Sequence, residues 1–173
     1  MMRAISSAEG KAALATLLAL GAIGGAWFSE LVLHFVPCML CLWERWPYYI
    51  GLPLVIPVFM LMRRPGAKKL AAAGLVLLGL IFLVSAGLGA YHSGVEWKWF
   101  TGPDCGGRLG NAPLSLDDFR KSLSSARVVL CTEAPMRVLG LSFAGWNAVA
   151  SLVIAGLFLG AARQVQGSSS ESQ

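Results

Sequence analysis

The sequence predicts an all-α membrane protein: a single domain over residues 1–173, built as a bundle of four transmembrane helices with a short amphipathic helix in its second outer loop. Two observations predict this fold class. Hydrophobic residues fill 56% of the 173 positions and charged residues only 13%, about half the share found in soluble domains. Four apolar stretches also reach the length of about 20 residues that a helix needs to cross a bilayer.

The four spans are expected at about residues 12–33, 42–62, 70–90 and 139–162. The first starts like a signal peptide, but its apolar part is too long for one, so we interpret it as a retained span. Pro47, Pro53 and Pro57 lie inside the second, either as kinks that shape packing or as breaks that open a cavity beside the helix. The glycines of the third span predict the most centrally packed helix.

Polar segments are expected at about residues 34–41 and 91–138, with a disordered tail at about 164–173. With four spans, both termini share the side of the basic turn at residues 63–69, and together they carry Arg3, Lys11, Arg63, Arg64, Lys68, Lys69 and Arg163. Cytoplasmic segments are enriched in Lys and Arg, so we expect cytoplasmic termini and two periplasmic loops. This orientation accounts for the net charge of +5, and no basic stripe indicates nucleic-acid binding.

All four cysteines then lie outside the cytoplasm, where thiols tend to be oxidised. Cys105 and Cys131 stand 26 positions apart, a pattern that a loop-stapling disulfide would also give. Cys38 and Cys41 close too small a ring to act as a staple, and such a pair usually carries redox or metal chemistry. A zinc site of four thiolates would need closer spacing in the second pair, so no metal site is predicted.

Cys41 is expected in the first turn of the second span, where the helix dipole and Arg45, one turn further on, favour its thiolate. Arg45 also has an alternative interpretation as an interfacial anchor. His92, at the outer end of the third span, is either solvated or a hydrogen-bond donor beside the cysteines. Glu30 and His34, one turn apart at the end of the first helix, are assigned no role.

The long loop contains two features that would hold it near the membrane surface. Residues 115–123 have a capping serine, acidic residues in the first turn and an apolar face, which predicts the short amphipathic helix. Trp97, Trp99 and Phe100 follow the third span like an aromatic belt. We expect these features to keep Cys105 and Cys131 within reach of Cys41.

This layout resembles the disulfide bond formation protein B (DsbB) family of bacterial inner-membrane thiol:quinone oxidoreductases. The resemblance covers nearly the whole chain, and the motifs that carry it are Pro37-Cys38-x-x-Cys41-x-x-Glu44-Arg45, Tyr91-His92 and Gly102-Pro103-Asp104-Cys105. It implies that a periplasmic thioredoxin-fold dithiol oxidase similar to DsbA attacks the Cys105–Cys131 disulfide at Cys105. Electrons would then pass to the Cys38–Cys41 pair, with Cys38 pairing transiently with Cys131.

The resemblance also implies that Cys41 donates electrons to a bound quinone, ubiquinone or menaquinone, with Arg45 and His92 near its oxygens. Two other interpretations stay open. A vitamin K epoxide reductase-like protein also combines quinone chemistry with two cysteine pairs, but its quinone-facing pair sits on a late span, whereas Cys38 and Cys41 open the second. A non-enzymatic membrane protein would use its disulfides only as staples.

Overall fold

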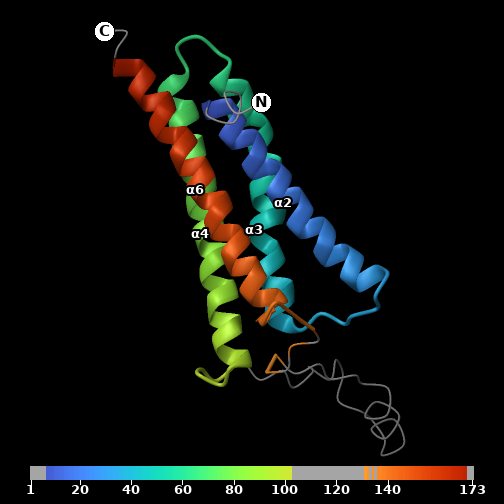
Figure 1. Cartoon of the computed structure of the whole chain (residues 1–173). Helices are drawn as coiled ribbons and strands as arrows, with labels where there is room; N and C mark the ends of the chain where they lie inside the picture. The colour runs from blue at the N-terminus through green and yellow to red at the C-terminus, as the bar shows by residue number, and fades with distance from the viewer. Residues whose placement is uncertain (1–6, 103–130, 133, 135, 171–173) are drawn as a thin grey trace, which may run out of the picture.

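The structure is a computed structural model that describes residues 7–102, 131–132, 134 and 136–170. It contains four long helices and one small hairpin: α2 (Ala8–Leu31), α3 (Met39–Met62), α4 (Lys68–Glu96), β1 (Arg137–Val138), β2 (Leu141–Ser142) and α6 (Phe143–Ser170). The helices run alternately up and down, so the two ends of the chain lie at the same end of the bundle as the α3–α4 turn (Figure 1). All four are long and apolar enough to span a membrane, which confirms the predicted all-α class with four transmembrane helices.

The helix ends differ from the expected spans in two places. Helix α2 ends at Leu31 and the backbone turns away, with His34 in a left-handed conformation at a φ of 56°. The prediction that Glu30 and His34 lie one turn apart on this helix is therefore wrong. Helix α6 continues to Ser170, through residues where a disordered tail is expected, because Val165 still packs into the core.

Helix α4 is the most buried of the four, as its small residues predict. A side-chain carbon added at Gly89 would lie 2.8 Å from the carbonyl oxygen of Ala144, so only glycine lets α4 and α6 approach so closely there. Further along, Phe82 of α4 stacks on Phe158 of α6, with ring centroids 5.9 Å apart. Close packing thus fixes α4 against α6.

The β1–β2 hairpin sets the start of α6. Leu139 and Gly140 at its tip have φ angles of 53° and 84°, the left-handed pair that a tight two-residue turn requires. Trp146, in the first turn of α6, donates a hydrogen bond from Nε1 to the carbonyl oxygen of Val138. The hairpin is antiparallel and leads directly into the helix.

Helix α2 packs closely only along its first half. Its buried residues are Ala12, Ala15 and Ala19. A side-chain carbon added at Gly21 or Gly25 would meet no atom within 4 Å. Figure 1 shows the second half of α2 diverging from the other helices toward the end where α3 begins. This divergence leaves room for the cavity described below.

Residues 103–130, which include Cys105 and the amphipathic helix expected at 115–123, lie outside the described part of the chain. The aromatic residues just after α4 are described. Phe100 stacks on Tyr91, with ring centroids 5.8 Å apart, and Trp97 meets Trp99 edge-on at 4.9 Å. Their rings are largely exposed, in the position expected of an aromatic belt.

Candidate redox site

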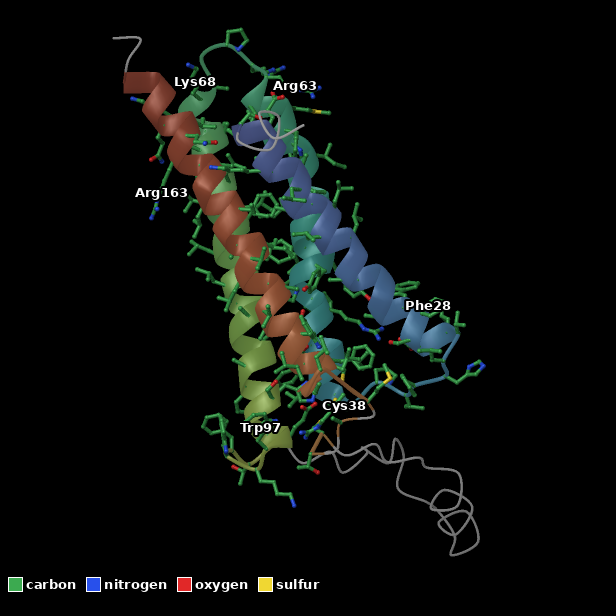
Figure 2. The ribbon with its side chains drawn as sticks, in the orientation of Figure 1. Phe28, Cys38, Arg63, Lys68, Trp97 and Arg163 are labelled. Carbon is green, nitrogen blue, oxygen red and sulfur yellow. The ribbon has the colours of Figure 1, made fainter. Side chains whose placement is uncertain are left out.

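Two cysteines open α3. Cys38 is the N-cap residue, and its sulfur accepts a hydrogen bond from the backbone N–H of Cys41 at 3.3 Å. Cys41 therefore lies in the first turn of the helix, as predicted, near the positive end of the helix dipole. The two sulfur atoms are 2.9 Å apart. Figure 2 shows Cys38 at the end of the bundle opposite Arg63 and Lys68.

The two thiols have different surroundings. Cys38 is 6% exposed, and its sulfur lies 3.5 Å from Nε2 of His92. The hydrogen bond that its thiol donates to Cys41, together with burial, raises the pKa of Cys38 to about 12. Cys41 is only partly buried and lines a cavity. The proton is thus held on Cys38, while the sulfur of Cys41 accepts a hydrogen bond; both residues line the cavity, and Cys41 is the more exposed of the two.

Cys131 lies close to this pair. It is 2% exposed and belongs to one buried cluster with Cys38, Leu40 and Val95, against which Cys41 packs. The cluster joins the start of α3, the end of α4 and the chain just before the hairpin. A cysteine of the long loop is therefore packed beside the Cys38–Cys41 pair.

A chain of hydrogen bonds runs from His92 into the bundle. Nδ1 of His92 lies 2.6 Å from Oε1 of Glu44, whose Oε2 accepts a hydrogen bond from Nδ2 of Asn147 at 2.8 Å. The Oδ1 of Asn147 in turn accepts from the hydroxyl of Tyr48 at 2.6 Å, and Ser151 lies 3.0 Å from that hydroxyl. Because a carboxylate oxygen accepts hydrogen bonds, Glu44 places a proton on Nδ1, and Nε2 faces Cys38. Three helices are held together here by polar contacts.

Arg45 bridges α3 and α2. Its Nη1 donates a hydrogen bond to Oε2 of Glu30 at 2.5 Å. The Arg45 side chain is only 12% exposed, whereas that of Glu30 is 37% exposed. Arg45 makes no other hydrogen bond within the described part of the chain. Glu30, to which the sequence analysis assigns no role, is therefore the residue that balances the charge of Arg45.

A cavity of about 350 Å³ lies beside the cysteine pair, and Cys131, Glu30 and Ser151 are not part of its lining. One wall is the unpacked half of α2, with Gly21, Ala22, Gly25 and Ala26, and other apolar sides come from Phe35, Val36, Phe143 and Ala150. The polar end is formed by Cys38, Cys41, Glu44, Arg45, His92, Glu96 and Asn147. Pro47, Pro53 and Pro57 do not line it. The second half of α2 thus supplies one wall of the cavity, and these three prolines supply none of its lining.

Comparison with known protein families identifies the chain. Residues 9–161 match the family described as Disulfide bond formation protein DsbB. The chain belongs to the DsbB family. It is also similar to the Rickettsia prowazekii (strain Madrid E) protein described as "Uncharacterized protein RP370", with 26% identity over 142 residues, which cover 80% of this chain and 78% of that protein. No solved structure matches the chain significantly.

Family membership confirms the resemblance stated from the sequence motifs. With four apolar helices of spanning length, this DsbB-family protein is a multi-pass membrane thiol oxidoreductase of disulfide bond formation. Its predicted site residues Cys38, Cys41, Arg45 and His92 come together around one cavity. Cys131 joins them through the buried cluster.

Sequence reasoning missed three residues of this DsbB-family site. Glu44 appears in the motif without a role, Asn147 lies within the fourth apolar stretch, and Glu30 is assigned no role. The structure pairs Glu44 with both His92 and Asn147, and Glu30 with Arg45. The feature of the sequence that could have identified them is a polar side chain in an apolar span. Placing such a side chain in a membrane costs free energy unless it has a partner.

Proposed function

We propose that this protein is a thiol:quinone oxidoreductase that reoxidises a periplasmic DsbA-like dithiol oxidase and passes the electrons to a membrane quinone. One observation carries the proposal. The Cys38–Cys41 pair borders an apolar cavity inside a membrane bundle, and the cationic side chain of Arg45 lies at the polar end of that cavity. A cavity of this kind suits an electron acceptor that is apolar, soluble in lipid and equipped with oxygen atoms.

The residues present fit a quinone. The volume of about 350 Å³ lies in the range of small-molecule sites, and the glycines of α2 leave open space in front of that wall. When bound, a quinone (ubiquinone or menaquinone) accepts two electrons and two protons. Arg45 would hold one of its oxygens by a charge-assisted hydrogen bond. His92 also lines the cavity and is a second candidate ligand, although its ring nitrogens face Glu44 and Cys38.

The cysteines divide the work as their surroundings suggest. The partner's thiolate attacks the Cys105–Cys131 disulfide at Cys105, and a second exchange leaves the partner oxidised and these two cysteines reduced. Cys131, packed beside Cys38, then exchanges with the Cys38–Cys41 disulfide. The reduced Cys38–Cys41 pair finally returns to a disulfide as two electrons leave from Cys41, the more exposed of the two cysteines that line the cavity. Each step moves two electrons. The exchange steps conserve the number of disulfides, and only the last step adds one.

The orientation proposed for the membrane follows the charges. Arg63, Lys68 and Arg163 lie at one end of the bundle, and Cys38 and Trp97 lie at the other (Figure 2). Since cations concentrate on the cytoplasmic side of bacterial membranes, the Arg63 end and both termini face the cytoplasm. The Cys38 end then faces the periplasm, where a DsbA-like partner reaches it, in the bacterial inner membrane.

The experiment is quinone reduction by the purified protein supplied with a reduced thioredoxin-fold oxidase. Turnover is expected to collapse when Cys41 is replaced by Ser, because the sulfur facing the cavity is lost. Unchanged turnover in that variant would overturn the mechanism. The wild-type protein with oxidised partner serves as the blank, since no electrons enter.

A further inference from the structure

Three metal-binding side chains meet at the start of α3. The sulfurs of Cys38 and Cys41 and Nε2 of His92 all lie within 4.8 Å of one another. The spacing of the four cysteines disfavours a zinc site made of thiolates alone, but His92 adds a ligand from another helix. We propose that the reduced site binds one Zn²⁺ ion through Cys38, Cys41 and His92, that Glu96, which lies outside this group of three, moves in as fourth ligand, and that the ion blocks electron transfer.

The distances fit a tetrahedral zinc ion. Zinc–sulfur bonds of about 2.3 Å and zinc–nitrogen bonds of about 2.1 Å place sulfur and nitrogen ligands about 3.6 Å apart, and two sulfurs about 3.8 Å apart. Cys38 Sγ and His92 Nε2 are already 3.5 Å apart. The sulfurs of Cys38 and Cys41 must separate from 2.9 Å to about 3.8 Å, which requires a side-chain rotation of the partly buried Cys41.

The surroundings of His92 also match a metal ligand. A zinc-bound imidazole usually donates its other N–H to a carboxylate, which fixes the ring and makes it a stronger ligand. Nδ1 of His92 lies 2.6 Å from Glu44, and Glu44 is itself held by Asn147 at 2.8 Å. Nε2 is the ring atom turned toward the sulfurs, and it is the one placed to bind the ion.

Glu96 is the independent observation that points to a cation. It is 7% exposed, its Oε1 lies 3.9 Å from Nε2 of His92, and its Oε2 has no hydrogen-bond partner within the described residues. Burying a carboxyl group without a partner is costly. Glu44 and Glu96 both flank the one imidazole, while the nearby cation Arg45 is engaged by Glu30. A divalent ion bound here would give Oε2 of Glu96 a partner.

Binding depends on the redox state of the pair. The reduced dithiol plus Zn²⁺ gives a zinc dithiolate and releases two protons, with no change of oxidation state. The disulfide form has no thiolate to offer, so it does not bind the ion. Sulfurs held by zinc can neither pass on electrons nor re-form their disulfide. The blocking part rests on the function proposed above, whereas the binding part does not.

The test uses the full-length, tag-free protein in detergent, with Cys105→Ser and Cys131→Ser so that only the site thiols remain. Zn²⁺ is titrated against a chromophoric chelator. The reduced protein is expected to bind one ion per chain, and the oxidised protein none. His92→Ala should weaken binding by at least about 100-fold and Glu44→Gln by about 10- to 100-fold. Ser93→Ala, next to His92 with a hydroxyl unbonded among the described residues, should change nothing.

Equal zinc binding by the oxidised protein, or by His92→Ala, would overturn the proposal, because the ion would then sit elsewhere or on the thiols alone. Unchanged zinc affinity in Glu96→Gln would show that Glu96 is not the fourth ligand. In the wild-type protein, Zn²⁺ should suppress quinone reduction, and full turnover with zinc bound would refute the blocking step. Absence of turnover without zinc would instead count against the proposed oxidoreductase, and the titration would still decide on the ion.

Discussion

Replacing Arg45 by Ala tests how the site holds its electron acceptor. Arg45 lines the cavity with one N–H engaged by Glu30 and no other hydrogen bond within the described residues, so its remaining N–H groups are available to a quinone oxygen. A hydrogen bond from a charged group contributes about 1.5–3 kcal/mol. At about 1.4 kcal/mol for each factor of ten, Arg45→Ala should raise the KM for quinone by roughly 10- to 150-fold.

The assay is steady-state reduction of a short-chain quinone by the purified protein with reduced partner oxidase. Glu30→Gln is the matched control, because it removes the ionic partner and keeps the guanidinium. The Glu30 side chain is 37% exposed, so its pair with Arg45 contributes up to about 1 kcal/mol, and KM should change by less than about fivefold. The reasoning is refuted if Arg45→Ala leaves KM unchanged, or if Glu30→Gln raises it equally.

Three further predictions concern packing, polar contacts and topology. Gly89→Ala should lower the free energy of unfolding by about 1–3 kcal/mol, because its methyl group would meet a carbonyl oxygen of α6. The measurement is the thermal midpoint in detergent, and Gly87→Ala, whose methyl group enters open space, is the control. Equal midpoints for the two variants would contradict this. Asn147→Leu should also lower the free energy of unfolding by about 1–3 kcal/mol, since it leaves Oε2 of Glu44 without this partner. An unchanged thermal midpoint would show that this contact is dispensable. Reduced Cys105 should react with a membrane-impermeant maleimide in cells with a permeabilised outer membrane; labelling only after lysis of the inner membrane would reverse the orientation.

The spans and the position of the cysteine pair were predictable because both depend on local sequence. Hydropathy over about 20 residues identifies a spanning helix whatever it packs against. Cys41 lies in the first turn of α3 because Cys38 caps the helix, a relation between residues three apart. The central place of α4 likewise follows from its small residues, such as Gly89.

The contacts that shape the site were not predictable, because they join residues far apart in the chain. Glu44 meets His92, 48 positions away, and Asn147, 103 positions away. These contacts depend on how three helices are rotated about their axes, and one sequence shows only that each span carries a polar residue. The pairing of Glu30 with Arg45 depends on where α2 ends, and the sequence suggested His34 as its neighbour.

The composition of α2 explains why a cavity exists beside the cysteines. Ala12 and Ala19 pack one half of the helix into the core, while Gly21 and Gly25 offer no side chain that could fill the gap left by the other half. Larger residues there would bury more apolar surface, yet they would also occupy the space in front of Cys41. The Glu30–Arg45 ion pair ties the diverging end of α2 back to α3 across this space. The loose packing of one helix thus gives a lipid-soluble molecule room beside the reactive sulfur, and a polar bridge keeps that helix in place.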